Sequence, residues 1–295
     1  MCTIEQRGIR GYPIGMKGEN SGKLRLLALD LDDTLLRSDQ SISHRTRSVV
    51  KRAEAAGAIV VLASGRIPQA MSQYSRLLNL HKKPGYLICN NGALVQESNT
   101  GNIVYESHIE PQIALAVCDL AGAEGFPVQM YEDDIMYVSR QNEYSSYDQK
   151  LTGVRQVVVE NFKTLVGGGC FKLIIPGDPM LLEPLESILR TYLGTDITLF
   201  TSRPYFLEIL PPETDKGTAL AKIAELKKIN PDETMAIGDS MNDEAMIRWA
   251  GIGVAMANGD DRIKSIANIV TDHGNDDDGA AEIIDKYFLG KDCPA

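Results

Sequence analysis

The stretch LALDLDDTLL, residues 27–36, joins an apolar run to three acids within four positions, Asp30, Asp32 and Asp33. The apolar run over 24–30 has the composition of a buried strand of a parallel sheet. An unpaired buried carboxylate is costly, so acids at the end of such a strand must reach water or share a cation. Residues 30 and 32 of an extended chain point to the same side, so both carboxylates can face one ligand.

Strand-like and helix-like segments alternate on both sides of this stretch and again near the end of the chain. Strands are predicted at 58–64, 86–89, 234–238, 252–256 and 268–271, and helices at 43–56, from Pro68 to about 78, at 218–228 and at 242–250. Such alternation is typical of an α/β fold with a doubly wound parallel sheet. Ligands of such sheets bind where the strands end.

The middle of the chain, about 93–209, breaks the alternation. ALVQES and NIVYES flank NTG like a hairpin, and strands are predicted at VQMY, IMYVS, FKLII and YFLEIL, with helices at 111–124 and 178–193. We therefore expect an inserted α+β domain over 93–209 in a core made of 23–92 and 210–290. Residues 1–22, rich in glycine, are expected to form a flexible extension.

Composition limits the partners of the chain. Its 295 residues carry a formal charge of −10 without a basic cluster, which argues against nucleic acid or an anionic membrane as partner. Five cysteines lie far apart without a CxxC pair, so a reducing cytoplasm is the predicted location. No run of 18 apolar residues predicts a membrane span, and the first 23 residues contain no apolar signal segment.

Two segments after the first strand offer groups for an anion. ASGR, residues 63–66, supplies the Ser64 hydroxyl and the Gly65 amide before a helix, although an ordinary Ser-Gly turn explains it equally well. Arg66 is interpreted as a surface residue or a supporting ion pair. Lys216 lies near a helix start, where a cation is unfavourable unless an anion is close. The alternative for Lys216 is a surface lysine beside Asp215 as helix cap.

A further acidic group follows the strand at 234–238. GDSMND places Asp239, Asn242 and Asp243 around a strand-to-helix turn, where carboxylates can hold a hard cation and an amide can orient a phosphate. Helix capping by Asp239 or Ser240 would explain one of the acids but not the whole set. The four histidines lack metal-binding spacing, and GNDDDG does not match a calcium loop.

DLDDTLL, ASGR, DKGTAL and GDSMND, in this order, resemble the four sequence motifs of the haloacid dehalogenase (HAD) superfamily. Because the insertion lies between the second and third motifs, the chain is similar to the Cof-type phosphatases, which carry a C2-type α/β cap domain. NNGALV (90–95) and GVAMANG (253–259) resemble two further stretches of that subgroup. The likeness covers about residues 23–288.

The resemblance implies a role for each of these residues. Asp30 is then the nucleophile that forms an aspartyl-phosphate, and Asp32 is the general acid and base. Mg²⁺ would be held by Asp30, the backbone carbonyl of Asp32 and Asp239. The remaining predicted site residues surround the phosphate: Ser64 with the amides of Leu31 and Gly65, Lys216, Asn242, Asp243 as a support for Lys216 or a metal-bound water, Asn91 near the cap hinge, and Arg66.

The predicted function is therefore that of a cytoplasmic Mg²⁺-dependent phosphohydrolase of small phosphomonoesters, such as sugar phosphates or related metabolites. We expect a monomer or homodimer without nucleic-acid or membrane partners. The alternatives are a phosphotransferase of the hexose-phosphate mutase type and a non-catalytic module that binds metal and phosphate. Cap residues around Gln129 to Tyr137 are expected to set substrate choice.

Three positions depart from the family pattern. Asp33 stands where glycine is commoner, and Ser64 stands where threonine is commoner. PPETDKG, residues 211–217, replaces a usual Pro-x-Gly-Val-x-Lys-Gly run and so lacks a glycine beside the predicted hinge. This last difference bears on the geometry of the cap more than on catalysis.

Overall fold

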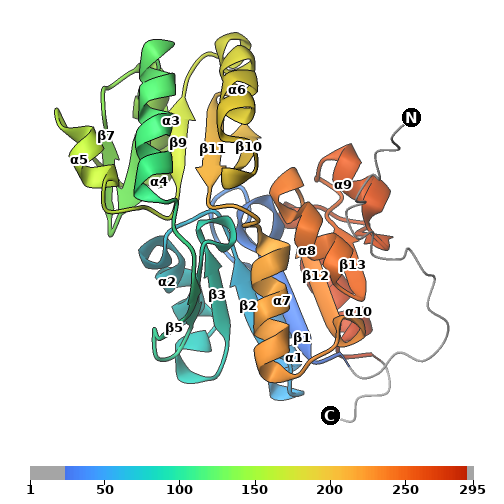
Figure 1. The fold of residues 1–295 in the computed structure, drawn as a ribbon. Helices are drawn as coiled ribbons and strands as arrows, with labels where there is room; N and C mark the ends of the chain where they lie inside the picture. Colours follow the sequence, from blue (N-terminus) through green and yellow to red (C-terminus); the bar gives the residue numbers. More distant parts are fainter. Residues whose placement is uncertain (1–23, 291–295) are drawn as a thin grey trace, which may run out of the picture.

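The computed structural model of the chain describes residues 24–290, which form two β-sheets with helices packed on their faces (Figure 1). The flexible extension predicted over 1–22 lies outside the described residues. Within the described residues, no helix is long and apolar enough to cross a membrane. Three of the cysteines, Cys89, Cys118 and Cys170, are buried free thiols.

The larger sheet has the strand order β14-β13-β12-β1-β2-β3-β4-β5. From β14 to β3 every neighbouring pair is parallel, and β4 and β5 add antiparallel strands at one edge. Its strands are β1 (Leu26–Asp30), β2 (Ile59–Ala63), β3 (Tyr86–Cys89), β4 (Leu94–Glu97), β5 (Ile103–Glu106), β12 (Thr234–Gly238), β13 (Ile252–Ala255) and β14 (Ile269–Val270).

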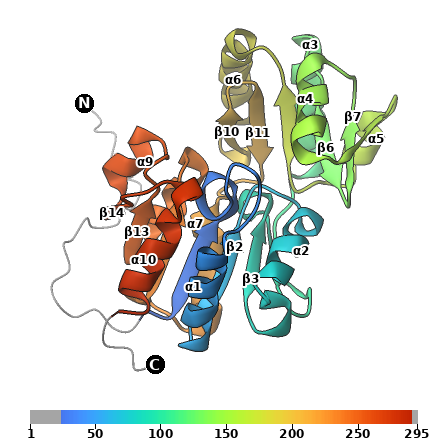
Figure 2. The same cartoon turned by 180° about the vertical axis from the view of Figure 1, so that it is seen from behind.

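Helices cover both faces of this sheet because its strands are apolar on both sides. In β1, Leu27 and Leu29 pack with α1 (His44–Ala55), α2 (Pro68–Leu77) and α10 (Gly279–Tyr287), which stand in front in Figure 2. Leu26 and Ala28 point to the other face, toward α7 (Lys216–Lys227) and α8 (Glu244–Trp249). The short α9 (Asp261–Ile266) packs beside α8. The predicted α/β class with a doubly wound parallel sheet is confirmed.

The smaller sheet has the order β10-β11-β9-β6-β7-β8 and is antiparallel except between β7 and β8. Its apolar face packs against α3, α5 and α6. The elements of this part are α3 (Pro111–Ala123), β6 (Gln129–Glu132), β7 (Ile135–Val138), α4 (Glu143–Thr152), β8 (Arg155–Val158), α5 (Phe162–Val166), β9 (Leu173–Pro176), α6 (Pro179–Leu193), β10 (Thr198–Arg203) and β11 (Phe206–Leu210).

The β4–β5 hairpin differs from the expected division of the chain. The sequence pattern predicts this hairpin as part of the inserted domain, whereas β4 pairs with β3 over Tyr86–Cys89, so the hairpin extends the larger sheet. The reason is that Val95 of β4 buries its side chain in the same core as Ile88 of β3. The chain therefore passes to the smaller sheet only after β5, and it returns between β11 and α7.

Candidate active site

The carboxyl ends of β1, β2, β3 and β12 meet at one edge of the larger sheet, below the smaller sheet (Figure 1). At this edge the Nζ of Lys216 lies 2.6 Å from Oδ1 of Asp30 and 2.7 Å from Oδ1 of Asp243. Lys216 and Asp243 are completely buried, and Asp30 is nearly so. Burial opposes the charge on Lys216, but Asp243 and Asp30 outweigh it and raise the pKa of the lysine above its usual value.

Asp243 is held in place by the turn that carries it. Its Oδ2 accepts hydrogen bonds from the backbone amides of Asp239, at 3.0 Å, and Ser240, at 3.2 Å. A Cβ on Gly238 would lie 2.5 Å from the Asp243 carboxyl carbon, so only glycine lets this side chain fold back onto the strand end. Asp243 therefore lies where it can support Lys216, one of the two roles predicted for it.

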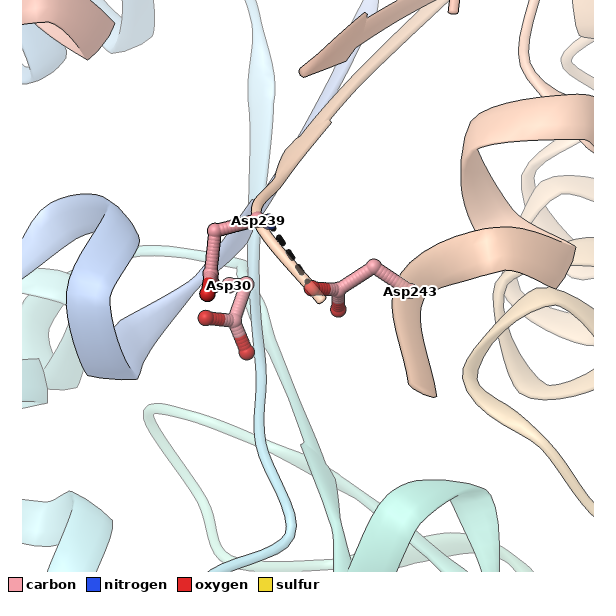
Figure 3. Close-up of side chains that lie close together, drawn as sticks. All are labelled: Asp30, Asp239 and Asp243. Carbon is pink, nitrogen blue, oxygen red and sulfur yellow. Dashed lines mark hydrogen bonds between the residues drawn. The ribbon is translucent and has the colours of Figure 1, made fainter. Parts of the chain in front are cut away.

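Asp30, Asp239 and Asp243 form an acidic cluster, with one oxygen of each within 4.8 Å of the others (Figure 3). Burial and the charge of Asp243 raise the pKa of Asp30 well above its usual value, although Lys216 acts in the opposite direction. The same two causes raise the pKa of Asp239 to about 7. The protein thus pays a free-energy cost to hold these carboxylates together, which is the electrostatic pattern of a functional site.

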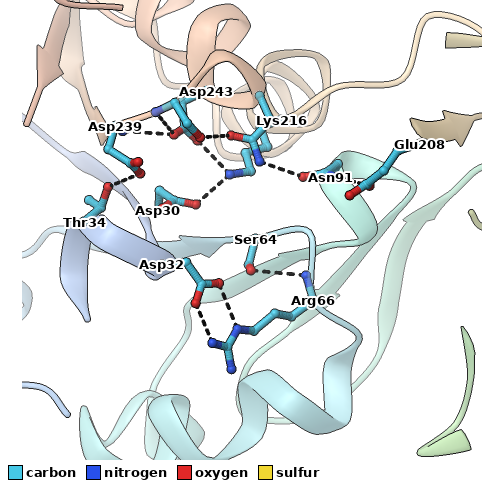
Figure 4. Close-up of polar contacts among 12 residues, drawn as sticks. Asp30, Asp32, Thr34, Ser64, Arg66, Asn91, Glu208, Lys216, Asp239 and Asp243 are labelled. Carbon is cyan, nitrogen blue, oxygen red and sulfur yellow. Dashed lines mark hydrogen bonds and ion pairs between the residues drawn. The ribbon is translucent and has the colours of Figure 1, made fainter. Parts of the chain in front are cut away.

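The oxygens of the cluster differ in what they already contact. Thr34 Oγ1 donates to Oδ1 of Asp239 at 2.9 Å, and Lys216 occupies Oδ1 of Asp30 (Figure 4). Among the described residues, no hydrogen bond reaches Oδ2 of Asp30 or Oδ2 of Asp239. These two hard oxygen donors fit a divalent cation, whereas both oxygens of Asp243 are already bonded.

Asp32 does not join the acidic cluster through its side chain. Arg66 Nε donates to its Oδ2 at 2.9 Å, and Arg66 Nη2 donates to its Oδ1 at 2.5 Å (Figure 4). Arg66 also donates to Gln40 and, at 3.4 Å, to the hydroxyl of Tyr74. Arg66 therefore forms an ion pair, one of the two interpretations given for it above. Its partner in the pair is Asp32, the predicted general acid and base.

Ser64 and Gly65 lie directly beyond the end of β2. Ser64 is buried, and its Oγ accepts a hydrogen bond from the Arg66 amide at 3.1 Å, which leaves the hydroxyl hydrogen for another acceptor. Leu31 is also buried, in the turn that follows Asp30. These positions place Ser64, Gly65 and Leu31 at the same sheet edge as Asp30.

Asn91 and Asn242 come together from distant parts of the chain. Asn242 Nδ2 donates to Asn91 Oδ1 at 3.2 Å, and Asn91 Nδ2 donates to Oε2 of Glu208 in β11 at 3.0 Å. Glu208 in turn lies 3.1 Å from Lys172. The two asparagines also line a cavity of about 350 Å³ whose other walls include Thr198, Phe200 and Arg248.

Sequence reasoning missed Thr34, Lys172 and Glu208. A charged residue inside an otherwise apolar strand is a signal that could have identified two of them, since FKLII and YFLEIL each contain a single charge. Thr34 carries no comparable signal, because a threonine in DLDDTLL is equally suited to a turn.

The chain matches a known protein family over most of its length. The family described as haloacid dehalogenase-like hydrolase matches residues 27–284. The chain belongs to this family. The match includes the segments that carry Asp30, Ser64, Lys216 and Asp239.

Individual members of the haloacid dehalogenase-like hydrolases match over nearly their whole length. The chain is 32% identical to the Bacillus subtilis protein named "Putative phosphatase YxeH", over 90% of this chain and 99% of the relative. It is 29% identical to the 5-amino-6-(5-phospho-D-ribitylamino)uracil phosphatase YcsE of the same organism, over 90% of this chain and 96% of the relative. The crystal structure of a haloacid dehalogenase-like hydrolase from Bacteroides thetaiotaomicron superimposes with a TM-score of 0.82 at 31% identity, covering 90% of this chain and 99% of that chain.

Proposed function

We propose that this haloacid dehalogenase-like hydrolase is a Mg²⁺-dependent phosphohydrolase that cleaves small phosphomonoesters through an aspartyl-phosphate. The observation that carries the proposal is the buried Lys216 between Asp30 and Asp243, with Asp239 beside them at the ends of adjacent parallel strands. Relatives named as phosphatases and the hydrolase family itself confirm the expected enzyme class, a phosphatase.

The proposed cation site uses carboxylate oxygens that accept no hydrogen bond from the described residues. Oδ2 of Asp30, Oδ2 of Asp239 and the backbone carbonyl of Asp32 would hold Mg²⁺, which favours hard oxygen ligands. When bound, the ion would neutralise charge on the phosphate and on the cluster. The raised pKa values of Asp30 and Asp239 fit this assignment, because a cation would relieve the repulsion that raises them.

Asp30 supplies the nucleophile in the proposed reaction. One of its carboxylate oxygens forms a bond to phosphorus while the bond from phosphorus to the ester oxygen breaks. Lys216, held at 2.6 Å, orients this carboxylate and favours its ionised form, against the burial and the repulsion from Asp243 that raise its pKa. Water then attacks the phosphorus of the aspartyl-phosphate, which releases inorganic phosphate and restores the carboxylate.

Asp32 is assigned the two proton transfers of this reaction. It would give a proton to the departing ester oxygen and later take one from the attacking water. Because Arg66 now engages both of its oxygens, the proposal requires at least one of these hydrogen bonds to yield when substrate binds. The Ser64 hydroxyl, the amides of Leu31 and Gly65, and Asn242 are assigned to the phosphoryl oxygens.

The cavity of about 350 Å³ that Asn91 and Asn242 line indicates the size of the substrate. That volume is at the lower end of the range for small-molecule sites, so it would accept only a small group such as a sugar. YcsE, a relative over nearly the whole chain, is named for a small phosphorylated metabolite. We therefore extend the proposal to sugar phosphates and related metabolites. A cytoplasmic location and a monomer or homodimer stay predictions.

The proposal is tested by the hydrolysis of p-nitrophenyl phosphate in the presence and absence of EDTA. We expect turnover with Mg²⁺, loss of turnover with EDTA and recovery when Mg²⁺ is added back. Equal turnover in EDTA would sink the metal-dependent mechanism. Incubation with a hexose phosphate in ¹⁸O-labelled water then separates a phosphatase, which places the label in phosphate, from a mutase, which accumulates a sugar bisphosphate.

A further inference from the structure

A buried ion pair lies in the smaller sheet at the side that faces the active site. Lys172, just before β9, and Glu208, in β11, are 3.1 Å apart, and each side chain is only 8% exposed. Glu208 pairs with Ile174 across the antiparallel ladder, so both charges lie on the face opposite the apolar core of this part. A buried ion pair is often no better for stability than apolar residues of the same size. Its contacts therefore call for an explanation other than stability.

Both members of the pair contact the larger sheet beside the proposed phosphate site. Lys172 Nζ donates to the carbonyl oxygen of Gly65 at 2.9 Å. Glu208 Oε2 accepts a hydrogen bond from Asn91 Nδ2 at 3.0 Å (Figure 4). The backbone amide of Asn91 donates to the backbone carbonyl of Ser64 at 3.0 Å. The pair thus touches the two turns that follow β2 and β3.

From Glu208 a chain of hydrogen bonds runs through Asn91 and Asn242 to Ser240, and we call it the Glu208 chain. A carboxylate can only accept, so Asn91 must turn its NH₂ group to Glu208 and its Oδ1 toward Asn242. Asn242 must then turn its own NH₂ group to Asn91, and its Oδ1 accepts from the Ser240 hydroxyl at 2.7 Å. The charge on Glu208 therefore fixes the orientation of both side-chain amides in the Glu208 chain, those of Asn91 and Asn242.

The packing around Asn91 leaves it little freedom to leave this arrangement. A Cβ on Gly65 would lie 3.0 Å from Asn91 Nδ2 and 3.1 Å from Asn91 Oδ1, so the amide lies flat against a residue that has no side chain. Asn91 itself is 2% exposed. Rotation of its amide by 180° would instead place Oδ1 against the Glu208 carboxylate, which is repulsive.

We propose that Lys172 and Glu208 are positioning residues, which set the direction of the Glu208 chain and so present an N–H of Asn242 to the phosphate. The inference rests on the proposed function, in which Asn242 contacts a phosphoryl oxygen. Of the two hydrogens on Asn242 Nδ2, one is used by Asn91, and within residues 24–290 no acceptor takes the second, which can therefore meet a phosphate oxygen. Because the pair belongs to the smaller sheet, the phosphate site is complete only when that sheet is seated on the larger one.

The test uses the whole chain with Mg²⁺ and inorganic phosphate as the probe. Calorimetry gives the dissociation constant of phosphate, and turnover of p-nitrophenyl phosphate gives KM and kcat. Three variants are compared with the wild type: Glu208→Gln, Lys172→Met and the double variant. Lys163→Met is the matched control, because this lysine of the same part forms an exposed ion pair with Asp119.

Glu208→Gln and Lys172→Met are expected to weaken phosphate binding about tenfold, the scale of one hydrogen bond to a charged group, and to raise KM more than they lower kcat. In Lys172→Met, two buried carboxylates, Glu208 and Asp148, lose the nearby cation, whereas the double variant leaves only Asp148 without it. The melting temperature of the double variant should therefore lie above that of Lys172→Met while phosphate binding stays weak. Lys163→Met should change neither the dissociation constant of phosphate nor KM.

Wild-type phosphate binding in all three variants would overturn the inference, as would recovery of binding together with stability in the double variant. A wild type that binds no phosphate would overturn it as well. Failure of the proposed function gives a different result, namely a wild type that binds phosphate but cleaves no phosphomonoester. In that case the comparison of phosphate binding among the variants still tests the inference.

Discussion

Arg66 holds the carboxylate of Asp32 with two parallel hydrogen bonds, Nε to Oδ2 at 2.9 Å and Nη2 to Oδ1 at 2.5 Å. The arginine comes from the turn after β2 and the aspartate from the turn after β1, so the pair ties together the first two motifs of the family. A fork of this kind fixes the plane of the carboxylate as well as its position. The predicted acid and base is therefore oriented before any substrate arrives.

We predict that Arg66→Met lowers kcat for p-nitrophenyl phosphate about tenfold or more, because Asp32 loses the constraint that orients it for proton transfer. Arg66→Lys should recover only part of the loss, since an ammonium group cannot make the double contact. Steady-state kinetics at saturating substrate measure both effects. Tyr74→Phe is the control, because it removes only the long contact of 3.4 Å to Arg66. Full activity of Arg66→Met would contradict the positioning of Asp32 by Arg66.

Asp30→Asn is predicted to abolish phosphate release and to make the metal-free protein more stable at pH 8. The pKa of Asp30 is raised, so its ionised form is disfavoured in the folded state. This cost builds up as the pH rises above the unfolded value of 3.8 and is complete above the folded pKa. A neutral amide of the same shape removes the cost. Thermal unfolding in EDTA should show a higher melting temperature for the variant.

The pH dependence provides the check on this explanation. The stability difference between Asp30→Asn and the wild type should shrink as the pH falls, since the wild-type carboxyl then takes up a proton and becomes neutral as well. A variant that melts below the wild type at pH 8 would mean that the ion pair with Lys216 outweighs burial and the repulsion from Asp243.

The central part of the site could be predicted from the sequence for a geometric reason. Asp30 ends an apolar strand, and Ser64 and Asp239 each follow directly after one. Parallel neighbouring strands bring their carboxyl ends to one edge. Lys216 could be found because a cation at a helix start needs an anion nearby. In the structure all four lie at that edge.

The contacts that cross between the two sheets could not be predicted in the same way. The contacts of Glu208 with Asn91 and of Lys172 with Gly65 depend on how the two sheets pack, and no local pattern encodes that packing. The same limit applies to the β4–β5 hairpin. The sequence predicts its turn but does not indicate which of the two sheets it joins.

Stabilisation by Mg²⁺ should depend on pH through Asp239. Its pKa is about 7 in the folded protein, against 3.8 in the unfolded chain, so the metal-free protein loses stability as the pH rises between these two values. A cation binds the ionised carboxylate in competition with the proton. The rise in melting temperature on adding Mg²⁺ should therefore be larger at pH 8 than at pH 6.

Asp239→Asn provides the control for this metal effect, because an amide does not titrate and is a weaker ligand. In this variant, the rise in melting temperature on adding Mg²⁺ should be small at both values of pH. An equal rise at pH 6 and pH 8 in the wild type would show that the proton on Asp239 does not compete with the metal.

Both positions at which this chain replaces a glycine of the family pattern adopt a positive φ, 56° at Asp33 and 52° at Glu213. Aspartate tolerates this left-handed conformation because its short side chain can bond locally, whereas glutamate gains no such contact. Glu213 lies in the return connection between β11 and α7, so strain there acts at the junction of the two sheets. The conformation costs about 1 kcal/mol for an ordinary residue.

Glu213→Gly should therefore leave the free energy of unfolding unchanged or raise it by up to about 1 kcal/mol, since relief of strain offsets the greater entropy of glycine in the unfolded chain. Glu213→Val should lower it by about 1–2 kcal/mol, because a β-branched side chain fits this conformation worst. Urea unfolding measures both changes. The matched control is Glu110→Gly in the other connection, where φ is −59° and glycine relieves no strain. Only the greater entropy of glycine in the unfolded chain then acts, so the free energy of unfolding should fall by about 0.4–1 kcal/mol. Equal losses from glycine at both positions would mean that the left-handed conformation of Glu213 carries no strain.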